Sequence, residues 1–412
     1  MKISRPLSHN CLTKDASAHR RIRRGEQIKI FFTCPRVFFC KRIFRIDESV
    51  LKSFLMSPVG YTAIKADYIF NPFMDCTGKR YLLLKDGIIE DISGSMPVCH
   101  GIRLLDFTGF AVSPFFCDYH LHFPQSALAS PDQITEALLH NGIHKVYEGG
   151  DSHLSGIEMK TLLKDSLEVR TAGYALYKKG TYGKFIGKGV EGFREARKLI
   201  DQLCEQGVDY IKLIHSGIFN AETAKITDGG FEQKELGEIV AYAKERGLDV
   251  ACHANGARKI HEAVSAGVSS LIHGLFISDE ALAMMAEKNI AFIPTVNAFA
   301  SLTRITNDQG TQTNVDRAVD RHLLTIKGAA DRGIKVLPGS DAGPHFIPYG
   351  TAYHQELDLF RKAGLSDAYI LSASVAGQIR QGMRADFLVL KGVQIEKIFI
   401  RGNDLEGAQY GA

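Results

Sequence analysis

Short apolar segments and longer amphipathic segments alternate along most of this 412-residue chain. Three segments have apolar positions at helical spacing: residues 190–207, 232–247 and 316–333. An apolar run follows each of them, at residues 208–214, 248–253 and 334–338. Strands separated by helices favour a parallel sheet, so the pattern predicts an α/β fold. The earlier segment 105–117 is apolar, short and rich in aromatic residues, which predicts one buried strand.

Two histidines follow that segment. His120 and His122 occupy positions i and i+2, which point to the same side of a strand. Two neutral imidazoles that converge at a strand end form half of a divalent metal site. The chain contains 15 histidines, so the spacing of this pair by itself leaves both metal binding and coincidence open.

Four further polar residues each stand at the end of an apolar segment, where we expect the C-terminal end of a strand: Lys212, His253, His273 and Asp341. In a parallel (β/α)8 barrel the C-terminal ends of all strands face one mouth, where active sites form. These residues would therefore meet His120 and His122 at one point, although they are far apart in the sequence. The pattern predicts a shared polar site at that mouth.

The motifs around these residues resemble those of the amidohydrolase superfamily of metal-dependent hydrolases. The run Ser-Pro-Phe-Phe-Cys-Asp-Tyr-His-Leu-His, which ends at His122, resembles the first barrel strand, although Phe115 stands where a glycine commonly follows the proline. His-Ala-Asn-Gly from His253, Leu-Ile-His-Gly around His273 and Gly-Ser-Asp-Ala-Gly around Asp341 are similar to the fifth-, sixth- and eighth-strand motifs. Tyr-Ile-Lys-Leu-Ile and His-Ala-Asn-Gly look most like the prolidase-like branch, which removes residues from dipeptides or N-acyl amino acids.

The resemblance covers residues 61–405 and implies a (β/α)8 TIM barrel with a small β-sandwich domain, formed by strands that flank the barrel at both ends. The implied domains are a composite β-domain, residues 58–112 and 380–412, and the metal-dependent hydrolase barrel, residues 113–379. The flanking segments agree with this. Residues 61–91 read as short strands with an Asp86-Gly87 hairpin turn, and residues 385–402 read as further strands.

The resemblance also implies a site for two divalent ions, with zinc as the expected metal. A lysine ammonium has no lone pair for a cation, but a neutral amine can capture carbon dioxide as a carbamate, as the two-metal members of the family do. The implied ligands are His120, His122 and Asp341 for one ion, His253 and His273 for the other, and carboxylated Lys212 with a hydroxide between them. Asp341 would also be the catalytic base that passes a proton to the leaving amine.

Other polar residues lie near the expected mouth. Five of them are candidates for its loops, the first two as possible substrate contacts: His215, His345, Tyr147, Asp151 and His153. Asp118 points away from the two histidines on an ideal strand. It is therefore either a residue that orients a ligand or a structural partner elsewhere.

The predicted function is hydrolysis of an amide or peptide bond, in a small substrate of dipeptide or N-acyl amino acid type, by a metal-bridging hydroxide. Two alternatives within the superfamily are a cyclic-amide or lactone hydrolase and a deaminase. Deaminases rely on a Glu near the fifth strand, whereas Ala254, Asn255 and Gly256 follow His253 here, which disfavours deamination. A catalytically inactive barrel that serves as a binding module is a third reading, disfavoured by the presence of all six ligand types.

Residues 1–57 depart from the α/β pattern and predict a basic extension that is disordered or not part of the native protein. Thirteen Lys or Arg and four Asp or Glu lie in residues 1–55, so this segment accounts for the overall charge of +4. Without it the chain is mildly acidic, and no nucleic-acid partner is expected.

Composition is consistent with a large folded enzyme. Apolar residues make up 45% of the chain, which allows a sizeable core, and no apolar run is long enough to span a bilayer. The eight cysteines form no Cys-x-x-Cys pair, a pattern typical of reduced thiols in the cytoplasm. We therefore expect a cytoplasmic protein with a small-molecule substrate and no membrane partner, with a homo-oligomer left open.

Overall fold

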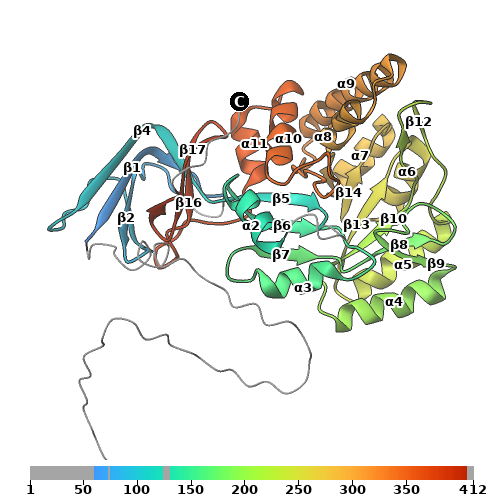
Figure 1. Ribbon diagram of the computed structural model, residues 1–412, viewed down its shortest axis with the longest axis horizontal. Coiled ribbons are helices and arrows are strands. Elements are labelled where there is room, and N and C mark those ends of the chain that lie inside the picture. Colours follow the sequence, from blue (N-terminus) through green and yellow to red (C-terminus); the bar gives the residue numbers. More distant parts are fainter. Residues whose placement is uncertain (1–59, 73–74, 124–129, 406–412) are drawn as a thin grey trace, which may run out of the picture. The chain divides into compact units, whose positions relative to one another are not determined.

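Strands and helices alternate along most of the chain, next to a separate sheet built from its two flanks. The computed structural model describes residues 60–72, 75–123 and 130–405, so the predicted basic extension lies outside the described residues. The arrangement is mixed α/β, as the sequence predicts (Figure 1).

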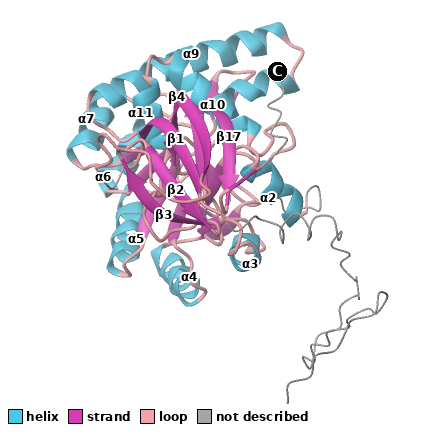
Figure 2. Ribbon diagram, turned by 90° about the vertical axis from the view of Figure 1, so that its left-hand side faces the viewer, coloured by secondary structure: helices cyan, strands magenta, loops and turns pink. Residues whose placement is uncertain are grey.

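The flanking sheet contains β1 (Thr62–Ile69), β2 (Tyr81–Lys85), β3 (Ile88–Ser93), β4 (Arg103–Ser113), β16 (Phe387–Lys391), β17 (Gln394–Ile400) and β18 (Asn403–Asp404). Its strand order is β18-β17-β16-β4-β1-β2-β3, with β4 parallel to β1 and antiparallel to β16. Segments from the two flanks therefore pair in one sheet (Figure 2). The predicted hairpin turn is confirmed, since Asp86 and Gly87 have φ values of 49° and 78°, as a type I′ turn requires.

The remaining strands are β5 (Phe116–Leu121), β6 (Ile143–Glu148), β7 (Glu168–Thr171), β8 (Ala175–Lys178), β9 (Gly187–Val190), β10 (Tyr210–Ile214), β11 (Phe219–Asn220), β12 (Lys225–Ile226), β13 (Asp249–Ala254), β14 (Ser270–His273) and β15 (Ala291–Ile293). The helices are α2 (Pro131–Leu139), α3 (Ser155–Leu162), α4 (Phe193–Glu205), α5 (Gln233–Glu245), α6 (Ala257–Ala266), α7 (Asp279–Glu287), α8 (Val296–Ala300), α9 (Gln309–Asp331), α10 (Thr351–Lys362) and α11 (Asp367–Ser374), with a 3₁₀ turn at Ser301–Ile305.

Two groups of parallel strands carry the predicted site, in the orders β15-β14-β13-β10-β8-β9 and β5-β6-β7. An extended segment, residues 335–342, lies between them and bonds to both. Towards β15, Phe292 N donates to Lys335 O and Leu337 N donates to Phe292 O, each at 2.8 Å. Towards β5, Asp341 N donates to His120 O at 2.8 Å and His122 N donates to Ala342 O at 2.7 Å. The segment that bears Asp341 is thus held beside the two histidines.

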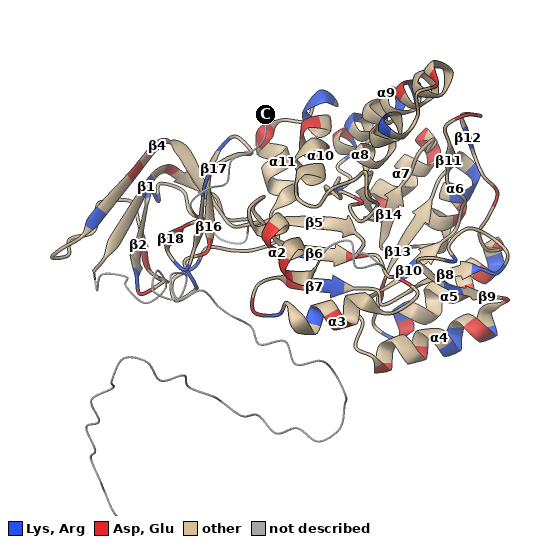
Figure 3. Cartoon of the chain, in the orientation of Figure 1, with Lys and Arg blue, Asp and Glu red and all other residues tan. Residues whose placement is uncertain are grey.

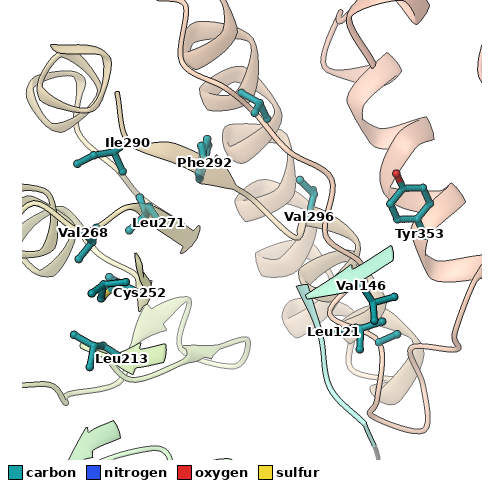
Figure 4. Packing of buried hydrophobic residues seen from close by; sticks show 14 of the residues in the cluster. Leu121, Val146, Leu213, Cys252, Val268, Leu271, Ile290, Phe292, Val296 and Tyr353 are labelled. Carbon is teal, nitrogen blue, oxygen red and sulfur yellow. The ribbon is translucent and has the colours of Figure 1, made fainter. Parts of the chain in front are cut away.

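Apolar side chains on the parallel strands pack against the helices. On α4 the buried residues are Ala196, Ile200 and Leu203, at helical spacing, while charged residues of both signs occupy six of its other ten positions (Figure 3). Figure 4 shows strand residues such as Leu213, Cys252 and Leu271 in the same core. Burial of each large apolar side chain contributes roughly 1.5–3 kcal/mol, so this packing fixes the strand ends on which the site stands.

Two expectations about element boundaries are wrong. The single strand expected at residues 105–117 is two strands, β4 and β5, because the chain breaks at Pro114, which has no N–H to donate to a ladder. The helix expected at residues 316–333 begins earlier, at Gln309, where the Asp308 side chain accepts a 2.7 Å hydrogen bond from Thr311 N. That first stretch is polar, so hydrophobic periodicity did not reveal it.

None of the described helices is both long enough and apolar enough to cross a membrane.

Candidate metal centre

A cavity of about 440 Å³ opens at the C-terminal ends of the parallel strands. All six predicted ligands line it: His120, His122, Lys212, His253, His273 and Asp341. Their strands explain the convergence, because neighbouring parallel strands end at the same edge. Lys212 lies within β10 rather than at its end, whereas His273 is the last residue of β14.

The imidazoles and the carboxylate are close to one another. Asp341 Oδ1 lies 3.3 Å from His120 Nε2 and 3.6 Å from His122 Nε2. One possible ligand atom from each of His120, His273 and Asp341 can be chosen so that all three lie within 4.8 Å of one another. The rings of His253 and His273 have centroids 4.4 Å apart. Nitrogen and oxygen donors at such separations suit a divalent cation.

Burial keeps these imidazoles neutral. It lowers the pKa of His120 and of His273 well below the ordinary value, with neighbouring imidazoles and Lys212 acting in the same direction. Burial also lowers the pKa of His253, to about 4. A neutral imidazole retains a lone pair on one nitrogen, which is the form that binds a metal ion.

Three of the rings are oriented through one nitrogen. His122 Nδ1 lies 3.1 Å from Gly150 O, and His253 Nε2 lies 3.0 Å from Gly217 O. His273 Nδ1 lies 2.6 Å from Thr295 Oγ1. Metal-binding histidines usually have such a partner on the nitrogen that does not bind the ion. The arrangement therefore fits a metal centre by the chemistry of its donors.

Lys212 is buried among these groups, with 1% of its surface exposed. Its Nζ lies 3.4 Å from His120 Nε2. Burial is the main cause that lowers the pKa of Lys212 to about 8, partly offset by Asp341. A substantial fraction of this amine is therefore neutral near pH 8, and only the neutral amine can react with carbon dioxide.

Glycines make room for the histidine rings. A Cβ on Gly149 would lie 2.6 Å from Cε1 of both His120 and His122, and a Cβ on Gly339 would lie 2.9 Å from His120 Cβ. Real Cβ atoms do not approach so closely, so any side chain at these two positions would displace a ring. The space for the His-x-His pair thus depends on residues in two other segments.

The backbone is strained at two of the candidate ligands. His273 and Asp341 have φ values of 69° and 54°, in the left-handed region that side chains other than glycine rarely adopt. Each such residue costs about 1–3 kcal/mol and persists where surrounding contacts hold it. Strain of this kind is typical of functional sites.

Buried carboxyl groups hold the backbone next to the ligands. Asp118 Oδ1 accepts hydrogen bonds from His120 N at 3.1 Å and Ser340 N at 2.9 Å, so it ties the segments of His120 and Asp341 together. Burial raises the pKa of Asp118 to about 7. Of the two possibilities left open for Asp118, these bonds favour a residue that orients the ligand strands.

Glu148 and Glu356 act in the same way, on the segment that follows β6 and on the first turn of α8. Glu148 accepts hydrogen bonds from Gly150 N at 2.7 Å and Thr171 Oγ1 at 2.6 Å, and Gly150 O contacts His122. Glu356 accepts from Val296 N at 3.0 Å and Asn297 N at 2.7 Å, directly after Thr295, the partner of His273. Burial raises the pKa of each glutamate to about 8. Neither glutamate was recognisable from the sequence, because a single Glu at the end of a strand or within an amphipathic helix has no characteristic spacing.

The five predicted mouth-loop candidates are not among the residues that line the cavity. His215 is buried, with Nε2 3.0 Å from Glu262 Oε2 and Nδ1 accepting from Phe231 N, so a substrate contact is wrong for it. His345 is exposed, and its ring lies against Phe346, which lines the cavity, so a substrate contact stays a prediction for it. Asp151 accepts backbone hydrogen bonds from His153 and Ser155.

Tyr147 is the second-last residue of β6, and its ring, stacked on that of Tyr119, lines a second cavity that extends to the N-terminal ends of the neighbouring strands. Its expected place in a mouth loop is therefore wrong as well.

Buried neutral imidazoles, an amine and a carboxylate around a cavity at parallel strand ends are typical of metal-dependent enzymes. The chain belongs to the amidohydrolase family, whose model matches residues 111–406. Membership supports a hydrolase of amide bonds.

Individual relatives are distant. An ochratoxinase from Aspergillus niger is 25% identical over 226 residues, which cover 50% of this chain and 46% of that protein. The match thus spans about half the length of this curated relative. Among solved structures, a Xaa-Pro dipeptidase with methionine in its active site matches with a TM-score of 0.68 and 23% identity, over 84% of this chain and 100% of that one. The Aspergillus niger ochratoxinase structure matches with a TM-score of 0.66 and 18% identity, over 85% and 97%. These likenesses show the fold.

Proposed function

We propose that this protein is a metal-dependent hydrolase that cleaves an amide bond in a small substrate. The observation that carries the proposal is Lys212, a buried amine with a lowered pKa that lies among His120, His253 and Asp341. A lysine is seldom buried unless it is paired or has a chemical role, and here its Nζ contacts an imidazole.

The proposed ligand set is the predicted one. His120, His122 and Asp341 would hold one divalent ion, His253 and His273 a second, and Lys212, carboxylated by carbon dioxide, would bridge them. Zinc is the proposed metal, because imidazole and carboxylate donors suit it. When bound, such ions lower the pKa of a coordinated water towards neutrality and polarise the carbonyl group of the substrate.

Asp341 is the proposed general base. Its carboxylate lies within 3.6 Å of both His120 Nε2 and His122 Nε2, at the centre of the donor cluster. It would accept a proton from the attacking water and deliver it to the leaving nitrogen as the C–N bond breaks. Burial raises the pKa of Asp341, which makes it a better proton acceptor than an exposed aspartate.

The fold proposed to support this site is a closed (β/α)8 barrel. Its eight strands would be β5, β6, the pair β7 and β8 counted together as one, β10, β13, β14, β15 and residues 335–342. The hydrogen bonds of residues 335–342 to both β15 and β5 support the closure. In this proposal the barrel comprises residues 113–379, and residues 58–112 and 380–412 form a β-sandwich domain.

We also propose that the protein is cytoplasmic.

Deamination is the weaker alternative. Asp341 is the one carboxylate among the described residues that line the cavity, so the second acidic group on which such deaminases rely has no candidate there.

Metal analysis of the purified protein with an amidase assay tests the proposal. We expect about two ions per chain after reconstitution with zinc, and loss of hydrolysis on chelation. His273→Asn should lower metal content and activity together. His261→Asn is the matched control, because His261 is exposed on α6 beside Glu280 and away from the cavity. A fully active protein without bound metal would overturn the proposal.

A further inference from the structure

The walls of the cavity differ sharply from its floor. Beyond the six proposed ligands, the described lining contains the polar side chains of Tyr182 and Asn255. The rest is apolar and rich in aromatic rings, and includes Phe123, Phe185, Ile218, Phe219, Phe299 and Phe346. Whatever part of a substrate extends away from the reacting bond must therefore contact apolar surface.

Two of these apolar residues are exposed at the cavity. Phe185 is 52% exposed and Ile218 is 41% exposed, although most large apolar side chains of the described chain are buried. Deeper in the wall, Phe219 and Phe299 are buried and pack edge to face with a centroid distance of 6.4 Å. Rings in this arrangement offer faces and edges to another aromatic group, and the cavity has the size of a site for a drug-sized ligand.

The same lining offers no partner for a second charged group on the substrate. Lys212 is the one Lys or Arg among the described lining residues, and it is 1% exposed and committed to the donor cluster. Carboxylation, as proposed above, would remove its positive charge. Asn255 is uncharged: its Oδ1 accepts from Leu275 N, and its Nδ2 lies 3.5 Å from His253 Nε2. A carboxylate placed against this wall would lose water without gaining a cation, which is costly.

We infer that the cavity selects uncharged amides that carry an aromatic group and lack a free carboxylate, rather than dipeptides or N-acyl amino acids. This inference rests on the proposed function and narrows its substrate class. Water would supply the oxygen to the acyl carbon, the C–N bond would break, and the amine would leave with the proton. Phe185, Ile218, Phe219 and Phe299 would set the preference, and the Tyr182 hydroxyl is the neutral polar group available to a substrate.

A matched pair of substrates tests the inference. N-benzoylglycinamide and N-benzoylglycine share the same scissile bond between the benzoyl carbon and nitrogen, and differ by a neutral carboxamide in place of a carboxylate. We expect kcat/KM for release of benzoate to be at least about tenfold higher for the amide, because the carboxylate has no cation on the wall. Equal or faster cleavage of the anion would overturn the inference. Coordination of the carboxylate by a bound metal would speed cleavage of the anion. Any such effect works against the expected preference for the amide, so a preference for the amide would be strong support for the inference.

A positively charged side chain introduced into the cavity wall should reverse the preference for the amide over the anion. Ile218→Arg should raise kcat/KM for the anion by about tenfold relative to the amide, since the new guanidinium would pair with the carboxylate. Leu324→Arg is the control of equal charge, because Leu324 is 77% exposed on α9 and does not line the cavity. An unchanged substrate ratio in Ile218→Arg would contradict the inference.

Binding of the intact compounds separates this inference from the proposed function. If neither compound is cleaved, equilibrium binding by calorimetry still compares them. Tighter binding of the amide, weakened by Phe299→Ala, would support the inference while counting against cleavage of this amide bond. Equal or tighter binding of the anion would overturn the inference whether or not hydrolysis occurs.

Discussion

The two ends of the parallel strands carry different chemistry. At the C-terminal ends lie the imidazoles, a buried amine and two residues with left-handed backbone. At the N-terminal ends a second cavity, of about 430 Å³, is lined by Tyr119, Tyr147 and Tyr210. Tyr119 and Tyr147 stack with centroids 5.3 Å apart, and exposed Arg170 pairs with Asp209 at 3.1 Å.

The difference shows that, on one set of strands, the contacts that stabilise the fold and the groups proposed to react lie on opposite sides. The tyrosine end has ordinary ring packing and a surface ion pair, and Tyr210 Oη donates to Glu148 O at 2.6 Å. The ligand end has groups that destabilise a fold on their own: buried titratable side chains and strained residues. Its geometry depends on Asp118, Glu148 and Glu356, which bind the neighbouring backbone. Substitutions at the two ends should therefore separate effects on turnover from effects on stability.

Lys212→Ala should have the largest effect on turnover. Removal of the amine eliminates the proposed bridge, so we expect one ion to be lost and kcat/KM to fall by at least about a thousandfold, a few kcal/mol of transition-state stabilisation. Elemental analysis and the amidase assay measure both. Short carboxylic acids should partly restore activity by taking the place of the carbamate. Lys178→Ala is the control, because Lys178 on β8 pairs with Glu235 and does not line the cavity. Wild-type turnover and metal content in Lys212→Ala would show that the lysine is structural.

Asp341→Asn should separate proton transfer from metal binding. The amide keeps one ligand oxygen but cannot accept a proton from water, and loss of a general base typically costs 10²–10⁴ in rate. We expect kcat to fall by at least about a hundredfold with at least one ion retained and substrate affinity little changed. Steady-state kinetics together with metal analysis check this. Turnover within a few-fold of wild type would mean that another group moves the proton.

The sequence predicted the parts of this site that have local spacing. His120 and His122 were recognisable from their i, i+2 positions, and Lys212 and His253 from the strands that carry them. The residues that hold these groups in place were not recognisable. Glu356 bonds to Val296, 60 residues away, and no local pattern connects them. His215 was misjudged because its loop turns inwards to Glu262, a contact that follows from packing rather than from distance along the chain.

The fold was predictable to a similar extent. Alternation of strands and helices was enough for the α/β class and for the Asp86-Gly87 turn, since both depend on short-range backbone preferences. The division between β4 and β5 was not recognised, because the last residues of β4 and the first residues of β5 form one largely apolar run across Pro114, and hydrophobic periodicity cannot locate a break inside such a run.

Glu356→Gln should affect stability in a pH-dependent way and turnover only moderately. Burial raises the pKa of Glu356 to about 8 in the folded protein, from an ordinary value of 4.5. The folded state then retains a proton that the unfolded state has lost, so this contribution to stability is complete below pH 4.5 and is lost as the pH rises through 8. Buried histidines such as His253, with a pKa of about 4, act in the opposite sense below about pH 6.5. The range from pH 6.5 to 8 therefore isolates the carboxyl groups.

In metal-free protein we expect the unfolding free energy to decline between pH 6.5 and 8, and the share of Glu356 in that decline to be up to about 2 kcal/mol. The variant should lose that share, so its unfolding free energy relative to that of the wild type should rise by up to about 2 kcal/mol between pH 6.5 and 8. Turnover should drop by about tenfold through Thr295 and His273. Urea denaturation at the two pH values is the measurement. Identical pH slopes in the variant and the wild type would show that the carboxyl group is already ionised in the folded state.

Tyr147→Leu, in the second cavity, should have the smallest effect on turnover. The change removes the stacking on Tyr119 and the 6.0 Å contact with the Tyr210 ring, but keeps an apolar side chain. Aromatic pairs contribute about 0.5–1.5 kcal/mol beyond the area they bury, so we expect the unfolding free energy to fall by about 1 kcal/mol. Because neither ring touches the ligand cluster, kcat/KM and metal content should stay within about twofold of wild type. Denaturation and steady-state kinetics on the same preparation check both values. A tenfold loss of kcat/KM with an intact fold would show that the two ends are coupled, and the Tyr210 hydrogen bond to Glu148 O would be the first connection to examine.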